Sequence, residues 1–236
     1  MSLNQDKVAL GLLIDSSYSM SSMDTGETIS SLNQAVKDQL DTKKEVLVYG
    51  GKFDTTYNLF LEGLQAKDVN ITEQDIKPSG MTALLDGIKF FINDIGIRLE
   101  NMEDRPGSVI IIILTDGEEN ASQSTSREEV MKLISHQKEK YNWNFVFLGA
   151  NQDAIETGAN LGIDRNSSCD FHYSPQGMSN VMRTVSNAIT HTISGLTPQV
   201  QFDDNDRIYS QCIDDDSIHN NGNESESQAF SSPICR

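Results

Sequence analysis

The chain has few basic side chains. Its 236 residues contain 18 Lys and Arg against 35 Asp and Glu, which gives a formal net charge of −17 at pH 7. Proteins that bind nucleic acid present a basic face to the phosphates, and no stretch of this sequence clusters Lys or Arg. The composition therefore argues against DNA or RNA as a partner.

Long apolar runs are also missing. No stretch approaches the roughly 18 apolar residues that a membrane helix needs. The apolar run nearest the start, residues 8–14, is short and has no basic segment before it, unlike a secretory signal. We therefore expect no membrane association and a cytoplasmic location.

Residues typical of catalytic and zinc sites are scarce. The three cysteines, Cys169, Cys212 and Cys235, are too scattered for a zinc site and predict no disulfide framework. Cys169 lies in an expected strand and is predicted to be a buried thiol. The four histidines stand apart, and the sequence contains no Walker-type phosphate loop, dinucleotide fingerprint or G-x-S-x-G elbow. These absences favour a protein that is not an enzyme.

Two apolar runs that lead into aspartates are the most informative feature present. Residues 8–14 precede Asp15, and residues 109–114 precede Thr115 and Asp116. Continuous Val, Ile and Leu runs of this length are typical of buried parallel strands. Ligands of open α/β sheets bind at the carboxyl edge of such strands, so both aspartates are predicted to lie at a binding edge.

Further oxygen-bearing side chains accompany these aspartates. The candidate metal ligands are Asp15, Ser17, Ser19, Thr82 and Asp116. Carboxylate, hydroxyl and water ligands favour Mg²⁺, Mn²⁺ or Ca²⁺ over zinc or copper. Mg²⁺ is the leading candidate, because it keeps bound waters and accepts a site with one or two carboxylates. The alternative is that each side chain only caps a helix or forms a turn.

The order of these residues resembles the von Willebrand factor A (vWA) family, which includes the inserted domains of integrins. That family's metal-ion-dependent adhesion site (MIDAS) reads D-x-S-x-S, then Thr, then Asp, and the five candidates match it completely. The resemblance covers roughly residues 8–194. Within that range KFDTTYNLF, at 52–60, is similar to the family's second-strand turn, and NFVFLGANQD, at 144–153, to its fifth strand. Small free-standing members occur in bacteria and phages, and this chain resembles that type.

The resemblance implies a role for each site residue. In the family the two serines bind the metal directly, the first aspartate binds mostly through water, and the threonine and second aspartate alternate with the state of the site. The ion then accepts an Asp or Glu carboxylate from a partner protein. For small bacterial members the partner can be an AAA-type ATPase complex.

Two other functions remain open from the sequence. One is a structural or virion-associated assembly protein with a stabilising metal. The other is a Mg²⁺-dependent phosphoryl transferase with Asp15 as the nucleophile, which is disfavoured because Ser17 stands where such enzymes carry an acid/base aspartate.

Periodicity and turn residues predict a doubly wound α/β fold. The sheet is expected to be mostly parallel and six-stranded, with one antiparallel edge strand and helices on both faces, as in Rossmann-like vWA domains. Helices are predicted to begin near Thr25 or Thr28, at Thr82, after a Ser126/Glu129 capping box, near Gln152 and near Pro175. Strands are predicted at 8–14, 45–53, 57–61, 108–115, 144–149 and 166–173.

The composition changes near residue 195. Residues 1–195 form the expected vWA domain, whereas residues 196–236 hold 8 acidic and 2 basic side chains and few apolar ones. Such a segment buries too little surface to offset its ordering entropy, so it is predicted to be a flexible acidic tail, of which 198–213 could lie on the domain. Its clustered acids lack the order of an EF-hand calcium loop.

Several polar residues could border the site. Asp24, Glu118 and Glu119 would raise cation affinity, whereas the alternative for Glu118 and Glu119 is that they only favour the N-terminus of a following helix or loop. Asn151 and Gln152 leave another strand at the same edge and could flank a ligand, or could serve only as helix-entry residues.

Overall fold

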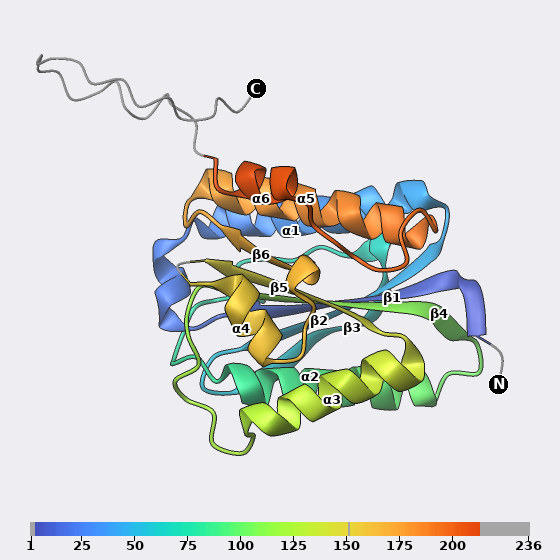
Figure 1. The fold of residues 1–236 in the computed structure, drawn as a ribbon, viewed down its shortest axis with the longest axis horizontal. Helices are drawn as coiled ribbons and strands as arrows, with labels where there is room; N and C mark the ends of the chain where they lie inside the picture. Colours follow the sequence, from blue (N-terminus) through green and yellow to red (C-terminus); the bar gives the residue numbers. More distant parts are fainter. Residues whose placement is uncertain (1–2, 151, 213–236) are drawn as a thin grey trace, which may run out of the picture.

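A six-stranded sheet forms the middle layer of the protein in the computed structural model, which describes residues 3–150 and 152–212 (Figure 1). The strand order is β3-β2-β1-β4-β5-β6. All neighbouring strands are parallel except β2 and β3, which form an antiparallel hairpin at one edge. The fold class predicted from the sequence is therefore confirmed. The strands are β1 (Leu3–Asp15), β2 (Glu45–Phe53), β3 (Tyr57–Gln65), β4 (Arg105–Thr115), β5 (Asn144–Ala150) and β6 (Ser168–Phe171).

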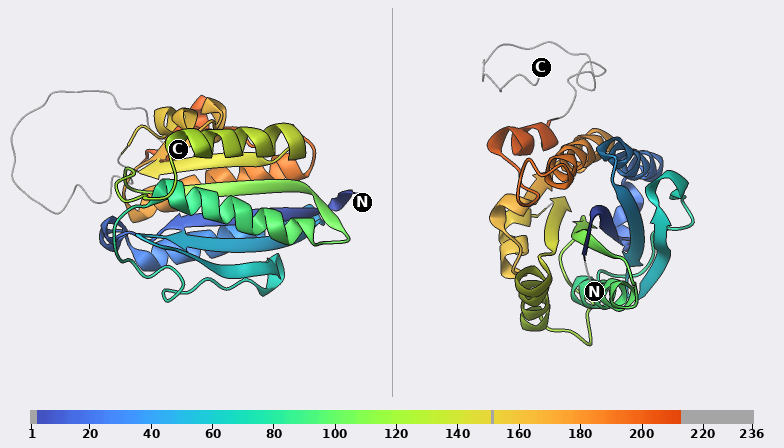
Figure 2. Two further views of the ribbon diagram at one scale, coloured as in Figure 1. Left: turned by 90° about the horizontal axis from the view of Figure 1, so that it is seen from below. Right: turned by 90° about the vertical axis from the view of Figure 1, so that its right-hand side faces the viewer.

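Helices cover both faces of this sheet (Figures 1 and 2). One face carries α1 (Thr25–Asp38), α5 (Pro175–Ile193) and the short α6 (Asp204–Ser210). The other carries α2 (Leu84–Glu100) and α3 (Arg127–Tyr141), with α4 (Ala154–Asn160) beside β5 and β6. Among the described residues, no helix combines the length and the apolar character required to cross a bilayer.

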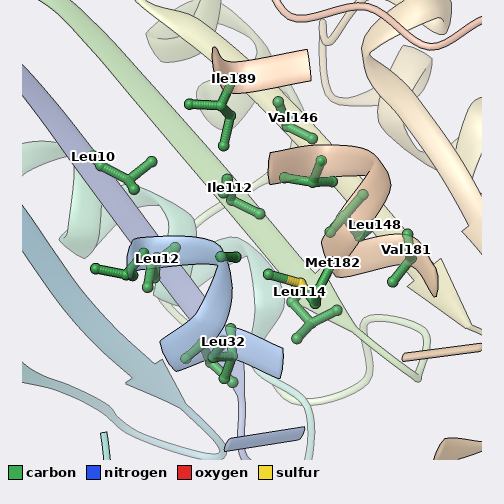
Figure 3. Close-up of a cluster of buried hydrophobic side chains, with 14 of the residues drawn as sticks. Leu10, Leu12, Leu32, Ile112, Leu114, Val146, Leu148, Val181, Met182 and Ile189 are labelled. Atoms are coloured by element: carbon green, nitrogen blue, oxygen red, sulfur yellow. The ribbon is translucent and has the colours of Figure 1, made fainter. Parts of the chain in front are cut away.

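The central strand β1 contributes to two hydrophobic cores because its side chains alternate between the faces. Leu10, Leu12 and Ile14 join the core under α1 and α5, whereas Ala9 and Leu13 join the core under α2 and α3. Figure 3 shows the first core, where side chains of β1, β4 and β5 meet those of α1 and α5. Both faces of β1 are covered, as the continuous apolar run predicted.

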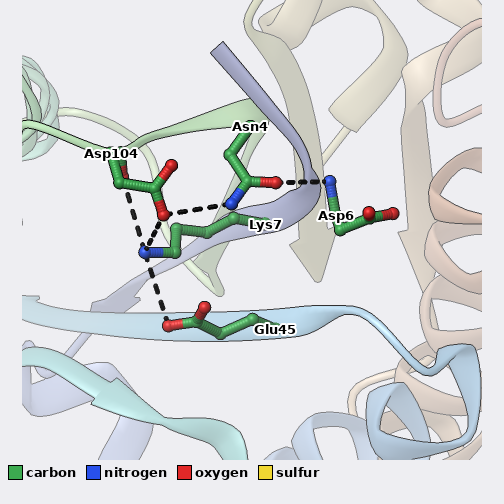
Figure 4. A network of polar contacts seen from close by, with 5 residues as sticks. All are labelled: Asn4, Asp6, Lys7, Glu45 and Asp104. Atoms are coloured by element: carbon green, nitrogen blue, oxygen red, sulfur yellow. Dashed lines mark hydrogen bonds and ion pairs between the residues drawn. The ribbon is translucent and has the colours of Figure 1, made fainter. Parts of the chain in front are cut away.

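A polar network fixes the amino-terminal ends of three strands (Figure 4). The Nζ atom of Lys7 on β1 lies 2.9 Å from Asp104 Oδ2, just before β4, and 3.5 Å from Glu45 Oε1 at the start of β2. Asn4 Nδ2 donates to the same Asp104 oxygen at 3.0 Å. These contacts hold β1, β2 and β4 in register at the end opposite to the predicted metal site.

One predicted helix cap and one predicted helix start are wrong. Helix α1 is capped by Asp24, whose carboxylate accepts the Glu27 N–H at 2.9 Å, and not by Thr25 or Thr28. Helix α2 begins at Leu84, two residues after Thr82, so Thr82 lies in the preceding loop. The predicted capping box of α3 is confirmed. Strand β2 has the predicted bounds, 45–53.

The chain continues to pack on the domain beyond residue 195. Val200 and Phe202 are buried, and the segment of residues 196–212, which we call the C-terminal strap, contains α6. Phe202 N donates to Asn166 O at 2.7 Å and His172 N donates to Ser210 O at 3.1 Å, which attaches the strap at both ends of β6. The rest of the predicted tail, residues 213–236, lies outside the described residues.

The cysteines in the described part of the chain differ in state. Cys169 in β6 is a free, buried thiol, as predicted, and burial raises its pKa to about 11. Cys212, at the end of the strap, is disulfide-bonded, so the prediction of no disulfide is wrong for this residue.

Candidate functional site

The two strand-ending aspartates lie at the same edge of the sheet. β1 and β4 are adjacent and parallel, and Ile14 pairs with Leu114 immediately before the strands end. Asp15 and Asp116 follow these positions and are both buried, at 1% and 5% exposure. The parallel register therefore brings together two carboxylates that are far apart in the sequence.

Hydroxyl groups connect the two carboxylates in a continuous chain of hydrogen bonds. Ser17 N donates to Asp15 Oδ1 at 2.7 Å, and Ser17 Oγ lies 2.9 Å from Ser19 Oγ. Ser19 Oγ in turn donates to Asp116 Oδ1 at 2.7 Å. Four of the five predicted side chains thus form one cluster.

Thr82 approaches this cluster from the loop before α2. A methyl group placed on Gly117 would lie 3.5 Å from Thr82 Oγ1 and 3.7 Å from Ser19 Oγ, so both hydroxyls border the same small space. The Thr82 N–H donates to Asn120 Oδ1 at 2.9 Å, and the Thr82 carbonyl accepts from Asn120 N at 3.0 Å. The backbone of Thr82 is therefore tied to the loop that carries Asp116.

The loop that carries Thr82 is also tied to the end of β1. Ser79 N donates to Ser16 O at 2.7 Å, and Tyr18 N donates to Gly80 O at 3.1 Å. Gly80 has φ +65°, a left-handed conformation that glycine adopts without a Cβ penalty. This backbone pairing places Thr82 beside the D-x-S-x-S turn.

Thr115 is a site residue that the sequence interpretation missed. It is fully buried, and its hydroxyl lies 2.6 Å from Asp15 Oδ2 and 3.1 Å from Gly117 O. A single hydroxyl proton serves one acceptor at a time, and the shorter distance favours the carboxylate. The position directly before Asp116 was the available signal, since the parallel register that pairs Ile14 with Leu114 places Thr115 beside Asp15.

The site carries negative charge that no basic side chain balances. None of the ion pairs among the described residues involves Asp15 or Asp116. Burial raises the pKa of Asp15 to about 6, although hydrogen bonds from Thr115 and Ser17 act in the opposite direction. Burial likewise raises the pKa of Asp116, against a hydrogen bond from Ser19. Desolvated carboxylates of this kind are stabilised by a cation.

The spacing of the site oxygens suits a small octahedral ion. Magnesium binds oxygen at about 2.0–2.1 Å, so adjacent ligands in its octahedron are about 2.9 Å apart. The Ser17–Ser19 and Ser19–Asp116 oxygen separations are 2.9 and 2.7 Å. No group of three or more His, Cys, Asp or Glu that could hold a metal occurs in the described part of the chain. The donors here are instead two carboxylates and three hydroxyls, which favours a hard cation.

Two of the three bordering acids serve their own local structure. Glu119 accepts the N–H groups of Leu85, Ala121 and Ser122 at 2.7–2.9 Å, which caps α2 and shapes the loop. Asp24 is the cap of α1. These contacts favour the helix-terminus alternative for Glu119 and give Asp24 a capping role that the sequence interpretation did not assign, whereas Glu118 is exposed.

Two further residues contact the site from more distant segments. Gln152 Nε2 donates to Gly117 O at 3.1 Å, and its predicted companion Asn151 lies outside the described residues. The hydroxyl of Tyr173, which follows β6, donates to Ser19 O at 2.8 Å. No local pattern in the sequence pointed to Tyr173.

Comparisons with known proteins identify the fold. No protein-family model and no curated protein matches the chain. The vWF domain of the type V pili tip protein Mfa5 from Porphyromonas gingivalis matches with a TM-score of 0.59 and 12% identity, covering 79% of this chain and 96% of that one. The fold is therefore that of vWA domains.

Two longer proteins match over part of their length. Proximal thread matrix protein 1 from the mussel byssus matches with a TM-score of 0.55 and 19% identity, covering 78% of this chain and 46% of that one. The ArnB paralog VWA2 from Sulfolobus acidocaldarius matches with a TM-score of 0.51 and 17% identity, covering 75% and 44%. The chain thus spans less than half the length of these two solved chains.

Proposed function

We propose that this protein is a metal-ion-dependent protein-binding module. A divalent cation, Mg²⁺ or Mn²⁺, is held by Asp15, Ser17, Ser19, Thr82 and Asp116, and it captures an Asp or Glu carboxylate of a partner protein. The observation that carries the proposal is the pair of buried carboxylates without a basic partner, joined by hydroxyls at the edge spacing of a magnesium octahedron.

The donor set explains why such an ion would bind a further ligand. Two carboxylates balance the double charge of the cation, and three neutral hydroxyls add no further negative charge. The ion therefore remains electrophilic, and five protein oxygens, bound directly or through water, leave the sixth octahedral position for water or for an incoming carboxylate. A carboxylate bound there makes a charge-assisted contact at the centre of a protein interface.

The arrangement supports binding better than catalysis. Ser17 stands where a second acid would be, and its hydroxyl lies 2.9 Å from Ser19 Oγ, so the residue two positions after Asp15 supplies no general acid or base. The similarity in fold to the vWF domain of a pilus tip protein and to a byssus matrix protein is compatible with a binding or assembly role.

Metal binding is tested with Mn²⁺ as the probe, by electron paramagnetic resonance of the free ion. We expect one bound Mn²⁺ per chain in the wild type, displaced by Mg²⁺, and at least tenfold weaker binding in Asp116→Ala. The matched control is Glu139→Gln, an exposed acid in the last turn of α3 at the opposite end of the sheet. Equal Mn²⁺ affinity in Asp116→Ala and the wild type would show that the ion binds elsewhere.

Carboxylate capture is tested on the same bound ion. Water-proton relaxation reports the waters on Mn²⁺, and excess acetate should displace one of them while chloride at the same ionic strength does not. Partner capture is then tested with immobilised protein in Mg²⁺ and in EDTA, alongside Asp15→Ala. The proposed function is refuted if partner capture is unchanged both in EDTA and in Asp15→Ala, and if acetate leaves the water-proton relaxation unaltered.

A further inference from the structure

Tyr173 links the candidate metal site to the other end of the chain. It lies between β6 and α5, and its ring packs against the core under α1 and α5. Its hydroxyl lies 2.8 Å from Ser19 O and 2.8 Å from Ser22 Oγ, 154 and 151 residues away in the sequence. Tyr173 therefore contacts the backbone of the turn that carries two candidate ligands.

That turn has little support of its own at Ser19. Residues Tyr18–Ser22 form a short 3-10 helix, and the Ser17 side chain makes no capping bond at its start. Ser19 is exposed, in contrast to the buried Ser17. Its carbonyl accepts hydrogen bonds from Tyr173 and from Ser22 Oγ, the latter at 2.9 Å. Of these two donors, Tyr173 is the one that belongs to another part of the fold.

The backbone next to Tyr173 is held on both sides. His172 N donates to Ser210 O of the C-terminal strap at 3.1 Å. On the other side Ser174 caps α5 by accepting Gly177 N at 3.0 Å. The buried Asn180 of α5 donates to Tyr209 O at 3.0 Å, which joins α5 to the same strap. The Tyr173 hydroxyl is thus presented from a fixed support.

We propose that Tyr173 is a positioning residue, which holds the Ser19 hydroxyl in place for the metal and makes the C-terminal strap part of the support of the metal site. This inference rests on the proposed function, because it assigns Tyr173 a role at that same site. The hydroxyl acts through the Ser19 backbone and does not itself need to touch the ion.

The test compares Mn²⁺ dissociation constants of the wild type and Tyr173→Phe, at a temperature where circular dichroism shows both to be folded. The substitution keeps the packed ring and removes only the hydroxyl. Loss of one hydrogen bond that orients a ligand should weaken Mn²⁺ binding by roughly three- to tenfold. Tyr141→Phe, at the exposed end of α3, is the matched control and should leave the constant unchanged.

A double-mutant cycle separates positioning from a general loss of stability. In a Ser19→Ala background the ligand hydroxyl is absent, so adding Tyr173→Phe should change the Mn²⁺ dissociation constant by less than twofold. Ser22→Ala, an exposed substitution that removes the neighbouring donor to Ser19 O, should weaken binding in the same direction as Tyr173→Phe.

The possible results are distinguishable. If the wild type binds Mn²⁺ and Tyr173→Phe binds it equally well, the role of Tyr173 is overturned and the proposed function stands. The role is also overturned if Tyr173→Phe weakens Mn²⁺ binding by the same factor in the wild-type and in the Ser19→Ala background. A wild type that binds no Mn²⁺ overturns both proposals.

Discussion

Replacing Asp15 by Asn should stabilise the metal-free protein, although it removes a proposed ligand. The Asp15 carboxylate is 1% exposed and has no basic partner. Thr115 Oγ1 lies near both Asp15 Oδ2 and Gly117 O, so after the substitution this hydroxyl can donate to Gly117 O and accept from the new amide. The amide therefore finds a partner without repacking.

The magnitude follows from the pKa of Asp15, which burial raises from 3.8 to about 6. A difference of about two pKa units corresponds to about 3 kcal/mol of unfolding free energy at neutral pH. Because the folded-state pKa is the higher one, the protonated side chain stabilises the fold below about pH 4, and that contribution is lost as the pH rises through 6. The variant does not titrate there, so its advantage should grow from near zero at pH 4 to about 1–3 kcal/mol at pH 7.

Magnesium should reverse the order of stability. A ligand present at about 1,000 times its dissociation constant adds about 4.1 kcal/mol to the unfolding free energy of the form that binds it. The wild type should gain this amount at pH 7, whereas Asp15→Asn should gain little. The opposite signs in EDTA and Mg²⁺ distinguish a metal ligand from a residue that only shapes the turn.

Urea unfolding at pH 4, 5, 6 and 7, in EDTA and in Mg²⁺, measures both effects. The reasoning is refuted if Asp15→Asn is less stable than the wild type in EDTA at pH 7, because burial of the charge would then not be unfavourable. It is also refuted if Mg²⁺ stabilises both proteins equally.

Three further predictions concern packing and reactivity. Gly11→Ala should destabilise the protein by about 1–3 kcal/mol in urea unfolding, because the added methyl would lie 2.7 Å from an isoleucine methyl. Gly96→Ala in α2 should instead stabilise the protein by about 0.5–1 kcal/mol, because the added methyl would lie in open space. Equal effects of the two would refute this account. Gln39→Ala should lower the thermal midpoint, with a loss of about 2–3 kcal/mol of unfolding free energy, because this fully buried side chain hydrogen-bonds α1 to α5. The control Gln34→Ala, at an exposed position, should change the unfolding free energy by less than about 0.5 kcal/mol. Cys169, a buried thiol with a pKa of about 11, should resist iodoacetamide at pH 8 until urea unfolds the protein. If mass spectrometry shows that Cys169 is labelled rapidly in the folded protein, its burial is contradicted.

Features fixed by adjacent residues could be predicted from the sequence. The apolar runs that form β1 and β4 located the sheet edge at which Asp15 and Asp116 lie, and the Ser126/Glu129 pair located the start of α3, because each signal lies within a few residues. The cap of α1 was misassigned because Asp24, Thr25 and Thr28 are all chemically suited to capping, and only the backbone path selects among them.

Features that depend on distant segments could not be predicted. Tyr173 reaches Ser19 only because the turn after β6 lies beside the turn after β1 in the folded sheet. The strap was predicted as part of a flexible acidic tail of which residues 198–213 could lie on the domain, because composition does not show that Val200 and Phe202 have a core to enter. The five candidate ligands are brought to one edge, and their metal remains a prediction that the Mn²⁺ titration addresses.

The strap also determines how this protein can associate with others. An unpaired sheet edge offers N–H and C=O groups to any extended chain and permits strand addition or aggregation. Arg207 of the strap donates to Ser168 O of β6 at 3.3 Å, and α6 packs along this strand, so the strap covers that edge. At the opposite edge two register shifts interrupt the pairing of β3 with β2, and such irregularities make an edge less suited to pairing with a further strand. Both edges of the sheet are therefore poorly suited to strand addition.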